Sequence, residues 1–108
     1  IPCAAVLTDE MIQGDYEFET GNQIFDCFAE KKLSHKEVEM VLLQSHGPFT
    51  WGKNAEKSVY NAAVLEEVAR MAMLTLQINP NTPRIKDTLR MKHYERKHGK
   101  NAYYGQGC

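Results

Sequence analysis

Residues 40–52 read Met40-Val41-Leu42-Leu43-Gln44-Ser45-His46-Gly47-Pro48-Phe49-Thr50-Trp51-Gly52. The run from Met40 to Ser45 is apolar without alternation, so it predicts a central strand covered on both faces. Gly47 and Pro48 are breakers and predict the end of this strand. His46 would then lie at the carboxyl end of a strand, where α/β folds place ligand and catalytic groups.

Two shorter segments before this strand carry helix signals. Thr8 can cap a short helix over residues 8–12. Residues 14–19 predict an irregular connector or a short extended piece. Thr20 and Gln23 match a capping box, so a second helix is expected from Thr20 to about Lys32. Its helical spacing predicts that three apolar side chains are buried, namely Ile24, Phe25 and Phe28.

Two further helices are expected after the strand. Asn54 can cap a helix that lasts to about Asn79 and is apolar on nearly all sides in its second half, which predicts burial in a larger body. Glu66 and Arg70 have the spacing of an ion pair on this helix. Pro83 at a first helical position predicts another helix from Thr82 to about Lys97, stopped by Gly99.

The inventory therefore holds one clear strand and several helices, and one strand is not a sheet. Either strands are missing upstream, or the chain is mostly helical with a large apolar surface to cover; we favour missing strands and an α/β fold. At 108 residues the chain is one domain or part of one. It lacks an initiator methionine before Ile1, which favours a chain that begins partway through a longer protein.

Composition argues against several classes of partner. The net charge is -1 and the sequence pI is about 6.5, so no strong field favours nucleic acid or an anionic membrane. No apolar run approaches the roughly 18 residues that span a bilayer. Cys3, Cys27 and Cys108 form neither a disulfide framework nor a CxxC motif, which favours reduced thiols in a cytoplasmic protein.

The histidines alone do not define a metal site. There are four of them, and none form an HxH or HxxxH pair. His93 and His98 would point about 140° apart on a helix, whereas zinc needs three or four ligands around one point. From the residues alone, His46 is either a ligand or a structural histidine at a strand end.

Other candidate residues also leave two interpretations open. Glu17, between two aromatic residues, is a partly desolvated acid poised for proton transfer or an ordinary surface carboxylate. A basic helix end that includes His98 is a solvated face suited to the helix terminus, or a contact for an anion such as phosphate. The pair Tyr103-Tyr104 is a docked tail, or supplies a phenol to a site on a neighbouring subunit.

Several motifs together resemble one family, the L-ribulose-5-phosphate 4-epimerases. The first are the segments 45–55 and 64–68, within and just after the stretch quoted above. The resemblance continues in Lys92-His93-Tyr94, Arg96-Lys97-His98-Gly99 and Ala102-Tyr103-Tyr104-Gly105-Gln106. It also covers the start of the chain, through Ile1-Pro2-Cys3, Thr8-Asp9 and residues 16–22. The motifs span the whole chain in the family's order and spacing.

The resemblance implies a fold and a reaction. The fold is part of an α/β/α sandwich with a mostly antiparallel central sheet, as in class II aldolases, in a homotetramer with active sites between subunits. The reaction inverts C4 of L-ribulose 5-phosphate to give D-xylulose 5-phosphate, in bacterial arabinose use. It implies a retro-aldol route in which Zn²⁺ stabilises the enediolate formed when the C3–C4 bond breaks.

The resemblance also implies roles for four residues. His46 matches a zinc histidine of the family, and Tyr104 matches the catalytic tyrosine, an acid/base that acts from the adjacent subunit. Glu17 and His98 match positions close to the site, and His98 would contact phosphate or assist Tyr104. Gln44 departs from several relatives that carry histidine there.

The resemblance further implies that residues 1–108 are the C-terminal portion of a single domain, with the N-terminal half missing. The other zinc ligands, the partner catalytic aspartate and most phosphate-binding loops would lie before Ile1. The chain alone is therefore expected to be inactive. Two alternatives remain: a class II sugar-phosphate aldolase, and a non-catalytic oligomerisation module of the same fold.

Overall fold

The computed structural model describes residues 1–103 and divides the chain into two compact units, Ile1–Leu74 and a second that begins at Thr75. In chain order, the elements are β1 (Cys3–Ala4), α1 (Asp9–Gln13), α2 (Tyr16–Glu30), β2 (Met40–Leu43), β3 (Gly47–Thr50), α3 (Ala55–Ile78) and α4 (Asp87–His98). The fold class is α/β, as predicted. No helix within residues 1–103 is long and apolar enough to cross a membrane.

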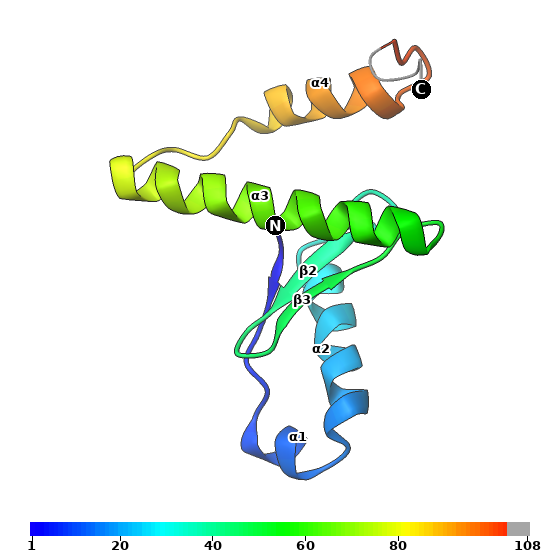
Figure 1. Ribbon diagram of the computed structural model, residues 1–108, viewed down its shortest axis with the longest axis vertical. Helices are drawn as coiled ribbons and strands as arrows, with labels where there is room; N and C mark the ends of the chain where they lie inside the picture. Colours follow the sequence, from blue (N-terminus) through cyan, green and yellow to red (C-terminus); the bar gives the residue numbers. More distant parts are fainter. Residues whose placement is uncertain (104–108) are drawn as a thin grey trace. The chain divides into compact units, whose positions relative to one another are not determined.

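The first unit contains a mixed sheet in the order β1-β2-β3. The short strand β1 runs parallel to β2, with Ala4 opposite Leu43, and β2 runs antiparallel to β3. Figure 1 shows the three strands side by side, and α2 packs against β1 and β2. The central strand therefore finds partners inside this chain, although the sequence analysis favoured partners upstream. The α/β/α sandwich and the mostly antiparallel sheet stay predictions.

The strand β2 is covered unequally on its two faces. Val41 and Leu43 are 0% and 2% exposed, whereas Met40 and Leu42 are half-buried. The face that carries Val41 packs against α2 and belongs to the main apolar core. The prediction of a strand covered on both faces is thus right for only one of them within the described residues.

The strand β2 ends at Leu43, before Gly47 as predicted, but the chain then turns back into a second strand that the sequence analysis did not predict and that begins at the breakers Gly47 and Pro48. Both belong to β3, where Gly47 faces Leu43 and Pro48 faces Leu42. The Leu42 N–H donates to the Pro2 carbonyl oxygen of the β1 side at 2.9 Å. The pair Leu42–Pro48 is therefore a non-hydrogen-bonded pair of the β2–β3 ladder, so proline costs this ladder no donor.

The helix α2 begins earlier than predicted. Asp15 is its N-cap, and its Oδ1 accepts from the Phe18 N–H at 3.4 Å. Thr20 is not a cap: it lies inside the helix, and its hydroxyl donates to the Tyr16 carbonyl oxygen at 2.8 Å. The predicted connector over residues 14–19 is accordingly wrong, because the aspartate provides an N-cap ahead of the threonine. The helix ends at Glu30, close to the predicted Lys32.

The core of the first unit forms where α2 meets the sheet. Its buried members are Ala4, Cys27, Phe28, Val41 and Leu43. Trp51 packs on this cluster, with its ring 5.5 Å from that of Phe28. Phe25 was predicted to be buried but is 77% exposed, because it lies about 160° around the helix from Cys27. Ile24 is half-buried.

The helix α3 begins as predicted, since Asn54 Oδ1 accepts from the Lys57 N–H at 2.9 Å. It ends at Ile78, one residue before the predicted end. Arg70 pairs with Glu67 rather than with Glu66. The apolar second half of α3 is exposed within this chain, so its burial in a larger body stays a prediction.

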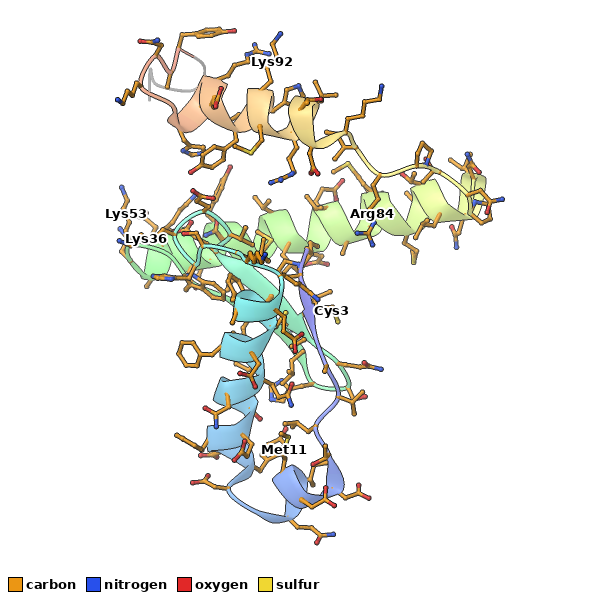
Figure 2. The ribbon with its side chains drawn as sticks, turned by 180° about the vertical axis from the view of Figure 1, so that it is seen from behind. Cys3, Met11, Lys36, Lys53, Arg84 and Lys92 are labelled. Carbon is orange, nitrogen blue, oxygen red and sulfur yellow. The ribbon has the colours of Figure 1, made fainter. Side chains whose placement is uncertain are left out.

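At the bottom of the first unit as drawn, α1 follows its cap Thr8, which confirms the short first helix. The side chain of Met11 lies between α1 and α2 (Figure 2), where its sulfur accepts from Gln23 Nε2 at 3.3 Å. This contact joins α1 to the middle of α2.

In the second unit, α4 begins at Asp87 rather than at Thr82. Thr82 closes a turn instead, since its N–H donates to the Asn79 carbonyl oxygen at 3.1 Å. The acid at Asp87 suits the positive helix end, which favours the later start. Gly99 ends the helix as predicted, and its N–H donates to the Glu95 carbonyl oxygen at 2.8 Å.

Candidate functional site

His46 lies in the turn that joins β2 to β3. Its backbone N–H donates to the Leu43 carbonyl oxygen at 3.1 Å, and the preceding residue, Ser45, has a φ of 60°. The imidazole is exposed. The tight turn therefore presents this side chain to solvent at the end of the hairpin, rather than placing it in the core.

Two aromatic rings lie beside the imidazole of His46. The ring of Phe49, on β3, has its centroid 5.1 Å away at an interplanar angle of 28°. The ring of Tyr16, on α2, lies 6.4 Å away at 29°. The sequence analysis did not assign a role to either ring. Tyr16 is far from His46 in the chain, so no local spacing could have indicated this contact.

Glu17 follows Tyr16 in the first turn of α2. The prediction that it lies in a non-helical stretch is wrong, although its carboxylate is exposed as the surface interpretation required. An acid at this position suits the positive end of the helix. Because the neighbouring Tyr16 ring contacts His46, the structure brings the helix turn of Glu17 close to the hairpin turn of His46.

The donors available for a metal ion are few in the described part of the chain. Residues 1–103 contain no group of three or more His, Cys, Asp or Glu side chains that could hold one. Neither ring nitrogen of His46 has a hydrogen-bond partner among those residues. An imidazole nitrogen is a common zinc ligand, so His46 fits one position of a zinc site. The described residues do not supply the other ligands.

A second candidate region lies at the end of α4, within the second unit. A hollow of about 470 Å³ is lined by His93, Tyr94, Arg96, Lys97 and His98. The His98 ring lies 4.8 Å from that of Tyr94, and the Arg96 guanidinium lies 5.3 Å from the Tyr103 ring. An arginine, a lysine and two histidines at one hollow suit an anion. This is the alternative that the basic helix end left open.

Tyr104, the predicted acid/base, lies outside the described residues. Its neighbour Tyr103 is described and is exposed. The structure therefore groups His46 with the turn of Glu17 in the first unit and His98 with the cations of α4 in the second.

The cysteines Cys3 and Cys27 are free, the first exposed and the second buried. Burial raises the pKa of the Cys27 thiol above its ordinary value. Free thiols agree with the predicted absence of a disulfide between these two. Cys108 lies outside the described residues.

A family model described as Class II Aldolase and Adducin N-terminal domain matches residues 4–73. The chain belongs to this class II aldolase family. The match nearly coincides with the first compact unit, Ile1–Leu74. It includes His46 and Glu17, whereas His98 and Tyr104 lie beyond it. The first candidate region is thus part of the class II aldolase fold itself.

Three curated relatives have the same protein name. This chain is 48% identical over 106 residues to the L-ribulose-5-phosphate 4-epimerase UlaF of Salmonella paratyphi A and to that of Salmonella typhi. It is 47% identical to the protein of the same name from Salmonella paratyphi C. Each alignment covers 98% of this chain and 46% of the relative. The chain spans about half the length of the curated relatives it matches.

Proposed function

We propose that the complete protein is an L-ribulose-5-phosphate 4-epimerase, an isomerase that inverts C4 to give D-xylulose 5-phosphate. The observation that carries this proposal is the 48% identity, over 98% of the chain, to relatives named for that activity. The exposed His46 on its hairpin turn adds a residue suited to the chemistry. The activity is proposed for the complete protein, since the chain spans 46% of those relatives.

We propose that His46 is one ligand of a zinc ion. Its support is the exposure of the ring and the absence, within residues 1–103, of any hydrogen-bond partner for either nitrogen. A bound zinc ion would supply Lewis-acid polarisation of the substrate oxygens. Since these residues hold no complete donor group, we propose that the 108 residues alone do not turn over substrate.

The proposed proton-transfer groups are Tyr104 and Glu17. A tyrosine hydroxyl has an ordinary pKa near 10, so at neutral pH it is ready to donate its proton, and nearby positive charge would help it to act as a base as well. Glu17 is exposed in the first turn of α2, where its carboxylate could accept a proton from bound substrate. Glu17 directly follows Tyr16, whose ring contacts His46. This contact supports the proposal that Glu17 lies near the metal ligand.

His98 is proposed to contact the phosphate of the substrate. It shares a hollow with Arg96 and Lys97, and guanidinium and ammonium groups bind phosphate oxygens by charge-assisted hydrogen bonds. We further propose a cytoplasmic homotetramer with active sites between subunits, in arabinose or ascorbate catabolism. The family match favours one alternative, a class II aldolase that releases the two fragments of a sugar phosphate.

The test is an assay of the complete protein with L-ribulose 5-phosphate, with and without a metal chelator. The proposal expects D-xylulose 5-phosphate to form, and chelation to abolish its formation until zinc is restored. Release of glycolaldehyde phosphate as a final product would favour the aldolase instead. No product, or activity indifferent to chelation, would contradict the proposed epimerase.

A further inference from the structure

The orientation of the His46 ring needs a physical cause. Rotation of an imidazole about its Cβ–Cγ bond (χ2) has a broad energy minimum, because this bond joins sp³ and sp² carbons. The bond itself therefore does not fix the plane of the ring. Metal-binding histidines usually gain their orientation from a hydrogen bond to the second ring nitrogen. Within residues 1–103, His46 has no such bond. Its ring contacts with Phe49 and Tyr16 are placed to orient it instead.

Both rings are held by elements of secondary structure. Phe49 lies on β3 opposite Val41, which is fully buried, and it packs against the main core. Tyr16 is the first residue of α2, directly after the N-cap Asp15, and its carbonyl oxygen accepts from the Thr20 hydroxyl at 2.8 Å. The two centroid distances lie in the range of favourable aromatic pairs.

We propose that Tyr16 and Phe49 are positioning residues for His46. Their rings hold the imidazole plane in one orientation before any metal binds, and so present a ring nitrogen to the zinc ion at low entropic cost. This inference rests on the proposed function, which makes His46 a zinc ligand. It assigns to two side chains the orienting role that a hydrogen-bonded carboxylate or carbonyl has in other zinc sites.

The experiment compares variants of the complete protein by their zinc dissociation constant and by the visible spectrum of the cobalt-substituted protein. Tyr16→Leu removes the ring on α2, and Tyr16→Phe keeps it without the hydroxyl. Phe49→Leu removes the ring on β3. The matched control is Phe25→Leu, which removes an aromatic ring from the same helix at a site that is 77% exposed.

We expect Tyr16→Leu and Phe49→Leu each to raise the zinc dissociation constant about 10-fold or more, as loss of an orienting partner does elsewhere. Both should also shift the cobalt spectrum, which a loss of stability alone would not change. Tyr16→Phe and Phe25→Leu should bind zinc like the unaltered protein. Should Phe49→Leu fail to fold, Tyr16→Leu still decides, because Tyr16 is 40% exposed.

His46→Asn separates this inference from the proposed function. If His46→Asn abolishes zinc binding while Tyr16→Leu leaves both the dissociation constant and the cobalt spectrum unchanged, the positioning role is wrong and the zinc ligand stands. If His46→Asn itself leaves zinc binding unchanged, His46 is not a ligand, and both proposals about this residue fail.

Discussion

The side-chain amide of Asn61 on α3 donates to the Trp51 carbonyl oxygen at 2.7 Å. The same nitrogen donates to Glu39 Oε2 at 2.8 Å, and Asn61 is 5% exposed. One buried side chain thus joins α3 to the residues that flank β2 and β3. The hairpin that carries His46 is anchored to the long helix through this contact.

Asn61→Ala should therefore destabilise the protein. It removes two hydrogen bonds and leaves the Trp51 carbonyl oxygen without its donor, a loss worth about 1–3 kcal/mol of unfolding free energy. Urea unfolding of the complete protein measures the change. The control is Asn81→Ala, an exposed site, where a change below about 0.5 kcal/mol is expected. Equal effects at the two positions would contradict the anchoring role of Asn61.

The hairpin turn offers a second stability test at Ser45, whose φ of 60° lies in the left-handed region. This backbone conformation costs free energy in a residue that has a Cβ, whereas glycine adopts it without that cost. Ser45→Gly should raise the unfolding free energy by up to about 1 kcal/mol.

The matched control is the preceding residue, Gln44, which is not among the non-glycine residues with positive φ. Gln44→Gly should lower the unfolding free energy by roughly 0.5–1 kcal/mol, because glycine adds freedom only to the unfolded chain. Thermal unfolding of both variants should show shifts of opposite sign. A destabilised Ser45→Gly protein would show that this turn does not store strain at Ser45.

The sequence correctly predicted several helix ends at which a single residue caps or stops the helix. Thr8, Asn54 and Gly99 were identified as a cap or a stop, and each has that place in the structure. Thr20 was misassigned because Asp15, an equally good cap, begins the helix earlier. Choosing between two caps depends on how the helix packs, and no local pattern contains that information.

Pairing between strands was less predictable for the same reason. Gly47 and Pro48 are breakers by local propensity, yet both pair with β2, because the register places Pro48 where no ladder donor is needed. The strand β1 is only 2 residues long, too short for any periodicity. Likewise, the resemblance to a family predicts that His46 is a site residue, whereas only the fold brings Tyr16 beside it.

The buried thiol of Cys27 predicts a pH dependence of stability. Burial raises its pKa in the folded state above the ordinary value of about 9.0. Above that value the unfolded chain loses its thiol proton before the folded one does, so stability falls as pH rises. The stability that the protonated Cys27 thiol contributes to the folded state is fully present below about pH 9, and it is lost as pH rises through the folded-state pKa. Urea unfolding between pH 7 and pH 11 should show this loss.

Cys27→Ala should remove that component of the pH dependence, although the variant starts from a lower stability because it trims the core. Cys3→Ala is the comparison: Cys3 is exposed, and its charge raises the Cys27 pKa less than burial does, so its loss should change the slope above pH 9 much less than Cys27→Ala. A slope that is the same in Cys27→Ala and in the unaltered protein would show that another group causes it.

Replacement of Tyr104 tests the proposed acid/base role. Tyr104→Phe keeps the ring and removes the hydroxyl, so turnover of L-ribulose 5-phosphate should fall by about 10²–10⁴-fold, the usual contribution of a general acid or base. The zinc dissociation constant should stay the same, since the phenol is not proposed as a ligand. Tyr103→Phe is the matched control, because its ring stays available to the Arg96 guanidinium, and it should keep nearly full turnover. Parallel loss of turnover and zinc affinity in Tyr104→Phe would assign Tyr104 to the metal site or to the fold instead of proton transfer.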